Sequence, residues 1–136
     1  MDEPRASPEE QEEEEQTTVS DPGPGESILK TISHMIGPND DYTYFNTDLI
    51  VYINSAFSRL RQLGVGPSSP FFIRDASAVW TDFITEEGHM EDVKDFVYKR
   101  VKRDFDPPTN SFLMEALNNE IDKLEWLLGS VAEVGY

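Results

Sequence analysis

Apolar and polar positions alternate at helical spacing in four segments of this chain. Residues 28–36 place apolar side chains on one face and are followed by a glycine, which stops a helix, and a proline, which cannot continue it. Residues 47–63 repeat apolar positions every three or four residues. The same period predicts a third helix over 89–104 and a fourth within 105–128. The expected fold class is therefore mainly α, a small bundle of about four helices.

Each expected helix has an apolar stripe that should face the core. The stripes consist of Ile28, Ile32, Met35 and Ile36 in the first helix, Leu49, Ile50, Ile53, Ala56, Phe57, Leu60 and Leu63 in the second, Met90, Val93, Val97 and Val101 in the third, and Leu113, Leu117, Ile121, Leu124 and Leu128 in the fourth. Asp106 is expected to cap the fourth helix and Pro107 to take its first position, where the missing N–H of proline costs nothing.

The segment between the second and third helices has a different pattern. Phe71-Phe72-Ile73 is short, aromatic and β-branched, and it lies between Pro70 and Asp75. This composition predicts one short strand or an extended loop near 70–75. The residues from 80 to 84 then return to the spacing of a helical turn.

Composition divides the chain into three parts. Residues 1–27 carry ten acidic residues against the single base Arg5, with few apolar side chains. Because such a segment buries too little surface to offset the entropy of ordering, we expect a disordered acidic tail. Residues 28–128 are the expected helical domain. Residues 129–136 leave the helical pattern at Gly129 and continue with alternating apolar positions, so they are interpreted as a C-terminal arm.

Charge and cysteine content exclude several classes of protein. The formal net charge is −16, of which −9 falls in the tail and −7 in the rest of the chain, so a general nucleic-acid binder is not expected. The absence of cysteine excludes disulfides, thiolate metal sites and cysteine nucleophiles. No secretory signal is recognised, and no apolar run approaches the roughly 20 residues of a membrane span. A soluble intracellular or virion protein that does not bind membranes is expected.

No arrangement of reactive side chains predicts an enzyme. His34 is interpreted as an ordinary residue of the first helix, and the adjacent pair Asp40-Asp41 as solvent-facing turn residues. His89 has acidic neighbours on both sides, so a small metal-dependent hydrolase is one alternative, but the spacing matches no recognised metal site. We therefore expect no catalytic residues, no bound metal and no cofactor.

Two sets of residues point instead to partner proteins. The chain has more large apolar residues than four short helices need for one core, and these are Phe71, Phe72, Trp80, Trp126, Val131, Val134 and Tyr136. Basic residues are expected on the exposed side of the third helix, namely Lys94, Lys99, Arg100, Lys102 and Arg103. These basic residues could meet nucleic acid, but a solvated face that pairs with acids of this chain or of a neighbour is favoured.

Four segments resemble the small head–tail connector proteins of long-tailed bacteriophages, also called head-completion or adaptor proteins. The segments are "DLIVYINSAFSRLRQLGVGP" (48–67), "VWTDFI" (79–84), "VKDFVYKRVKRDFDPPTNSFLMEAL" (93–117) and "IDKLEWLL" (121–128). The "FDPP" corner, followed by "SF" and then "LEW", is the most specific element. The resemblance covers about residues 28–128 and leaves out the acidic tail.

The resemblance implies a structural virion protein at the head–tail interface, made in the host cytoplasm and without enzymatic activity. It implies a ring of twelve copies beneath the portal protein that extends the DNA channel and joins the capsid to the tail. A stopper or tail-completion protein would bind the other side of the ring. DNA would pass through the channel without sequence-specific binding, because an acidic wall repels the phosphate backbone.

A ring built from head-to-tail contacts needs two unlike faces on each subunit. The residues expected between subunits are Phe71, Phe72, Arg74, Lys94, Lys99, Arg100, Lys102 and Arg103. The residues expected to contact the portal are Trp126, Leu128, Val131, Val134 and Tyr136. The alternative function is an acidic decoy or chaperone-like binder, whose glutamate-rich tail occupies a basic partner.

Overall fold

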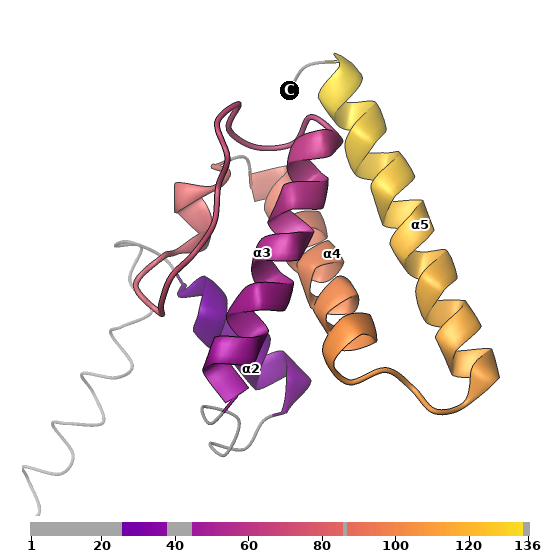
Figure 1. The fold of residues 1–136 in the computed structure, drawn as a ribbon. Coiled ribbons are helices and arrows are strands. Elements are labelled where there is room, and N and C mark those ends of the chain that lie inside the picture. The colour runs from indigo at the N-terminus through magenta and orange to yellow at the C-terminus, as the bar shows by residue number, and fades with distance from the viewer. Residues whose placement is uncertain (1–25, 38–44, 86, 135–136) are drawn as a thin grey trace, which may run out of the picture.

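The computed structural model describes residues 26–37, 45–85 and 87–134, which form four α-helices and one short 3-10 helix. In chain order these are α2 (Ile28–Ile36), α3 (Asn46–Gln62), η2 (Trp80–Asp82), α4 (Glu87–Phe105) and α5 (Ser111–Val134). Helix α3 lies in the middle of the bundle, with the loop 63–79 on one side and α5 on the other (Figure 1). Helix α4 packs against both α3 and α5. The prediction of a mainly α bundle of about four helices is confirmed.

The core is formed by the apolar stripes of the helices together with the segment around η2. Its buried members include Ile28, Ile32, Leu49, Ile53, Phe57, Leu60, Trp80, Phe83, Val93, Val97, Val101, Ile121, Leu124 and Leu128. Two predicted core residues, Met35 and Leu113, are exposed instead. Both lie in terminal turns, and the helical period sets the face of a residue without ensuring that a neighbouring element covers it.

The start of α2 is joined to the segment that precedes η2. Ile28 N donates a hydrogen bond to Ala78 O at 3.0 Å, and Trp80 N donates to Glu26 O at 3.1 Å. These bonds form an isolated antiparallel bridge at Ser27, whose side chain also caps α2. Trp80, which the sequence placed among the surplus apolar residues, is buried in the core.

The segment 67–79 is an extended loop without a strand anywhere in its described residues. Before it, Gly64 and Gly66 have positive φ angles of 88° and 89°, a left-handed conformation that turns the chain back after α3. Asn54 of α3 then holds the loop through both of its amide atoms. Its Nδ2 donates to Ile73 O at 3.0 Å, and its Oδ1 accepts from Ile73 N at 2.7 Å. Of the two alternatives predicted for this segment, the extended loop is correct.

The corner between α4 and α5 differs from the prediction in its cap. Helix α5 begins after Asn110, whose Oδ1 accepts hydrogen bonds from Phe112 N at 2.8 Å and Leu113 N at 3.2 Å. Asn110, and not Asp106, is therefore the cap residue. Pro107 cannot begin the helix because a second proline follows it, and the residue before a proline avoids the helical conformation.

The last turns of α5 occupy the position expected for a C-terminal arm. The prediction that the helix ends at Gly129 is wrong, because α5 continues to Val134. Gly129 lies against the end of α3, where an added Cβ would be 3.8 Å from Leu63 Cδ2. Ala132 lies near Gly64 in the same region. Glycine weakens a helix interior by about 1 kcal/mol relative to alanine, and the packing of the neighbouring turns offsets this cost.

None of the helices in the described ranges is long and apolar enough to cross a membrane. The expected disordered tail falls mostly on residues 1–25, which lie outside the described residues. The Asp40-Asp41 pair and Tyr136 lie outside them as well.

Candidate partner-binding surfaces

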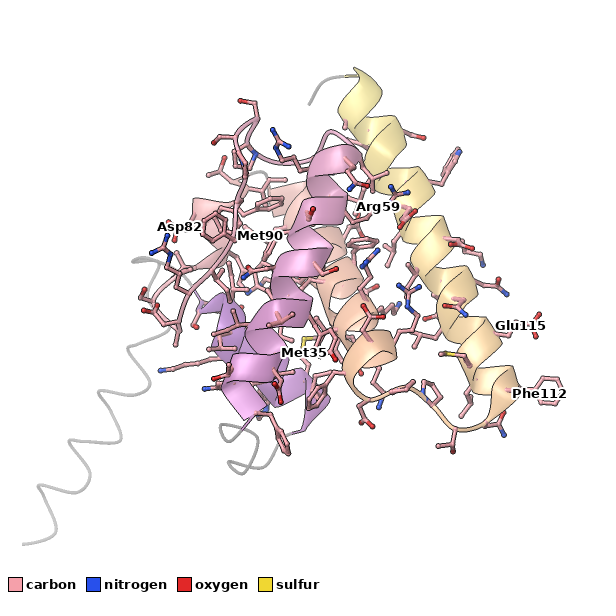
Figure 2. The ribbon with its side chains drawn as sticks, in the orientation of Figure 1. Met35, Arg59, Asp82, Met90, Phe112 and Glu115 are labelled. Carbon is pink, nitrogen blue, oxygen red and sulfur yellow. The ribbon has the colours of Figure 1, made fainter. Side chains whose placement is uncertain are left out.

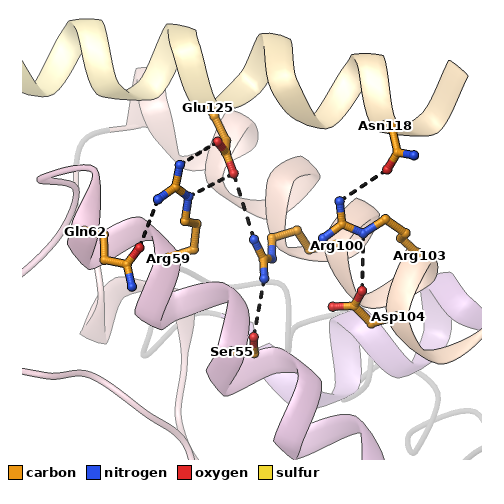
Figure 3. Close-up of polar contacts among 8 residues, drawn as sticks. All are labelled: Ser55, Arg59, Gln62, Arg100, Arg103, Asp104, Asn118 and Glu125. Carbon is orange, nitrogen blue, oxygen red and sulfur yellow. Dashed lines mark hydrogen bonds and ion pairs between the residues drawn. The ribbon is translucent and has the colours of Figure 1, made fainter. Parts of the chain in front are cut away.

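Three helices meet at the carboxylate of Glu125 on α5 (Figure 3). Arg59 of α3 donates two hydrogen bonds to it, from Nε to Oε2 at 3.0 Å and from Nη2 to Oε1 at 2.9 Å. Arg100 of α4 approaches the same carboxylate, with Nη1 3.9 Å from Oε2, and its Nη2 donates to the Ser55 hydroxyl at 3.4 Å. These contacts tie α5 to both α3 and α4.

The charged groups of this site shift one another's pKa values. Hydrogen bonds from Arg59 hold the pKa of Glu125 below its usual value, and the same bonds raise the pKa of Arg59. Burial lowers the pKa of Arg100, because its charged form gives up water. The ion pairs are internal to the bundle, so we assign this site to stability rather than to chemistry.

Two lysines of α4 are paired within the chain rather than displayed on an exposed side. Lys94 Nζ lies 2.9 Å from Glu26 Oε1, at the start of the described chain. Lys99 Nζ lies 3.0 Å from Asp95 Oδ2 and 3.1 Å from Glu120 Oε1, so it connects α4 to α5. Both lysine side chains are half-buried.

The two basic residues in the last turn of α4 are paired in the same way. Lys102 Nζ lies 3.0 Å from Asp106 Oδ2, and Arg103 Nε lies 3.2 Å from Asp104 Oδ1. Arg103 Nη1 also donates to Asn118 Oδ1 of α5 at 3.3 Å. The prediction of an exposed basic side on this helix is therefore wrong, because all five basic side chains are half-buried and have acidic partners, two of them on α5. The favoured interpretation, pairing with acids of the same chain, is confirmed for these side chains.

The outward face of α5 carries two large aromatic side chains that the rest of the bundle does not cover. Phe112 is 80% exposed and Trp126 is 73% exposed, on the side of the helix opposite the buried Ile121 and Leu128. Figure 2 shows Phe112 pointing away from the bundle. Trp126 was expected at a contact surface, whereas Phe112 was not. The signal that identifies both is the spacing of seven residues from Phe112 through Asn119 to Trp126, on the face opposite the core stripe.

A shallow hollow lies beside Trp126 on this face. It has a volume of about 510 Å3 and is lined by Asp122, Lys123, Trp126 and Leu127. Within the described part of the chain, the side chains of Asp122 and Lys123 take part in no hydrogen bond or ion pair. We call these four residues the α5 hollow.

A second exposed apolar group lies on the extended loop. Phe72 is 52% exposed, and the guanidinium carbon of Arg74 lies 5.5 Å from the centre of its ring, a cation–π arrangement. The neighbouring Phe71 is turned inward, with its ring 4.9 Å from that of Phe57 and 5.1 Å from that of Phe83. Of the two phenylalanines expected between subunits, Phe72 is therefore the one available on the surface.

A model of the phage connector protein family matches residues 28–134, a range that contains all four helices. The chain belongs to the phage connector protein family. Neither a curated protein nor a solved structure was found to match the chain. The resemblance seen in the sequence is confirmed, and the family supports a structural connector role in a phage.

The residues expected to contact the portal differ in their availability in this connector. Trp126 is exposed, and Val131 is half-buried. Leu128 is only 2% exposed, so it serves the core and is not available to a partner. The side chain of Val134 and all of Tyr136 lie outside the described residues.

The described residues of the connector contain no group of three or more His, Cys, Asp or Glu side chains that could hold a metal ion. His34 is exposed on α2, and His89 is half-buried in the first turn of α4.

Proposed function

We propose that this connector assembles as a ring beneath the portal protein, extends the DNA channel and joins the capsid to the tail. The observation that carries the proposal is the family match over residues 28–134, which spans the whole described bundle. A single chain of this size cannot enclose a DNA duplex, so copies must associate around it. Closed cyclic symmetry is the usual way in which identical subunits do this, and the sequence resemblance implies twelve copies.

The charge of the chain supports a channel through which DNA slides. Binding to phosphates comes from lysine and arginine side chains that can replace counterions. The chain has a net charge of −16, and the five basic residues of α4 already have acidic partners in their own chain. A wall made of such subunits repels the DNA backbone and does not hold it.

The exposed apolar residues support contacts with other proteins of the head–tail interface. Trp126 and Val131 lie toward the C-terminal end of α5, so this end is the proposed contact with the portal. A stopper or tail-completion protein would bind the opposite side of the ring. Aromatic side chains at this level of exposure are typical of the centres of protein interfaces.

Native mass spectrometry of the purified connector, alone and mixed with the portal protein of the same phage, tests the proposal. We expect a closed oligomer of one copy number, with twelve copies as the expected value, either alone or bound to the portal. A second sample with the portal omitted separates self-assembly from assembly on the portal. A connector that remains monomeric under both conditions would contradict the proposed ring.

A second candidate function is an acidic decoy or chaperone-like binder. The observation that favours it is the concentration of acidic residues in 1–27, where ten acids face a single base. In that case the tail, and not the helical bundle, would contain the binding determinants. The family match excludes the tail and covers the bundle, so the connector function is preferred.

A further inference from the structure

Two exposed apolar groups lie on opposite sides of the molecule. The α5 hollow is on the outward face of α5. The extended loop and α5 lie on opposite sides of α3 (Figure 1). We call the exposed loop residues Pro70, Phe72 and Arg74 the loop patch. Neither group is needed for the core, which is closed by other residues. Each side of the bundle therefore has its own uncovered surface.

The loop patch carries a positive charge that has no acidic partner. Arg74 lies over the ring of Phe72, and no ion pair or hydrogen bond joins its guanidinium to any described residue. The arrangement presents a flat aromatic ring and a cation together, and both are accessible. Such a pair suits a partner surface that offers an apolar wall beside a carboxylate.

The α5 hollow offers this complementary chemistry. Trp126 and Leu127 supply apolar walls. The rim carries one acid and one base, Asp122 and Lys123, and no side-chain contact to another described residue engages either of them. Asp122 lies one helical turn before Trp126, and the guanidinium of Arg74 lies over the Phe72 ring, so seating this ring against Trp126 would bring the guanidinium toward Asp122. The two surfaces therefore match in their apolar walls, and Asp122 gives Arg74 a partner on the side of the rim away from Lys123.

A second copy of the chain fits this pairing better when the contact is head-to-tail than when it is symmetric. A symmetric contact would place one α5 face against another, and each face carries the acids Glu115 and Asp122 against the single base Lys123, so both sides would have a net negative charge. It would also leave the loop patch uncovered. A head-to-tail contact covers both groups, and because they lie on opposite sides of the subunit, it continues from copy to copy until a ring closes.

We infer that the loop patch of one copy docks into the α5 hollow of the next. Phe72 packs against Trp126 and Leu127, and Arg74 forms an ion pair with Asp122 of the neighbouring copy. The inference rests on the proposed function, because it gives the proposed ring its two unlike faces. It also assigns Trp126 to the contact between copies and leaves the last residues of α5 for the portal.

Cysteine cross-linking tests the contact directly, because the chain has no cysteine of its own. Ser69→Cys places a thiol beside the loop patch, and Lys123→Cys places one at the rim of the α5 hollow. The two variants are mixed at high concentration and treated with a short bis-maleimide. We expect a covalent dimer that contains one chain of each variant, whereas each variant alone gives about one-tenth of that yield or less.

Further substitutions test which side chains form the contact. Trp126→Ala in the Lys123→Cys chain is expected to reduce the cross-linked yield about tenfold, as for a central aromatic residue of an interface. Val51→Ala is the matched control, because Val51 is 62% exposed on α3 and belongs to neither group. Arg74→Asp should reduce the yield, and Asp122→Arg in the other chain should restore it. If Asp122→Arg does not restore the cross-linked yield of the Arg74→Asp chain, the proposed ion pair is contradicted.

The outcomes separate this inference from the proposed function. Cross-linking of Lys123→Cys chains with one another would show a symmetric contact and would overturn the inference. Absence of any cross-link in a protein that native mass spectrometry shows to be a ring would also overturn it, while the proposed ring would stand. A cross-link between the two variants in a protein that forms no ring, even with the portal, would support the proposed contact between copies. The same result would contradict the proposed ring.

Discussion

At the scale of single residues, Glu125 joins the three long helices through one carboxylate. Arg59 holds it from α3 and Arg100 approaches it from α4, where burial makes an unpaired charge expensive. Removing the carboxylate would leave Arg100 half-buried with only a neutral hydrogen-bond partner, the Ser55 hydroxyl. The stability of the bundle should therefore depend on this residue and on its ionisation.

Glu125→Gln is expected to lower the free energy of unfolding at pH 7 by about 1–2 kcal/mol. Because the pKa of Glu125 is lowered in the folded chain, its contribution is fully present above the ordinary value of 4.5 and is lost as the pH falls through the folded-state pKa. The difference in the free energy of unfolding between the variant and the parent chain should therefore become smaller in acid. Urea denaturation followed by circular dichroism at pH 7 and in acid measures both effects.

The matched control for this prediction is Glu115→Gln on the same helix. Glu115 is exposed and points away from the bundle (Figure 2), so its substitution should leave the free energy of unfolding unchanged to within about 0.5 kcal/mol. An equal loss of stability at both pH values for Glu125→Gln would show that shape, and not charge, is what matters at this position.

The residues of the core could largely be predicted from the sequence, whereas the exceptions could not. The period of 3.6 residues places Ile53, Val97 and Ile121 on inward faces because each lies in the middle of a helix that has neighbours. Leu113 obeys the same period but lies in the first turn of α5, where nothing covers it. Whether a terminal turn has a neighbour depends on the tertiary arrangement, which periodicity does not contain.

At the scale of elements, the ends of α5 were the least predictable part of the fold. The apolar stripe predicts the middle of the helix. Its first residue is set by steric effects of the two prolines before it, and its last turns are set by packing against the distant helix α3. Gly129 predicts a helix end when it is considered alone. Because the end of α3 packs beside it, the helix continues through the glycine.

Gly129→Ala is expected to raise the free energy of unfolding by about 0.5–1 kcal/mol, because alanine favours a helix interior and the added Cβ meets Leu63 only at ordinary contact distance. Equilibrium urea denaturation measures the change. An unchanged or lowered stability would indicate that residues 129–134 do not form a helix packed against α3.

Gly66→Ala is expected to change the free energy of unfolding in the opposite direction. Gly66 has a φ of 89°, and an added Cβ would overlap the ring of Phe83, so we expect a loss of about 2 kcal/mol or more. The contrast between the two glycines separates an effect of helix propensity from an effect of backbone conformation and space.

At the scale of the whole molecule, the candidate surfaces were predicted in part. Phe72 and Trp126 were expected at contacts because they exceed what the core needs, and Arg74 was expected beside Phe72 between subunits. All three are exposed, and their contacts stay a prediction. The basic residues of α4 were misjudged, because charge in a sequence does not reveal whether acids of a distant helix lie beside it. The packing of α5 along α4 supplies acidic partners for Lys99 and Arg100. The other three basic residues pair with acids close to them in sequence or at the start of the described chain.

Deleting residues 1–25 is expected to leave binding to the portal unchanged to within about threefold, because the helical bundle and not the tail carries the proposed contacts. The deletion stops before Glu26, which pairs with Lys94 and belongs to the bridge at the start of α2. Analytical ultracentrifugation of the truncated chain with the portal measures the binding. Loss of binding would favour the acidic decoy instead.

The two hydrogen bonds between Asn54 and Ile73 have a thermodynamic consequence for assembly. They fix the backbone of the loop beside Phe72 and Arg74 before any other copy arrives, so little conformational entropy remains to be lost when subunits meet. The heat capacity change of association should then reflect only the apolar area that is covered, without the larger signal of a segment that folds as it binds.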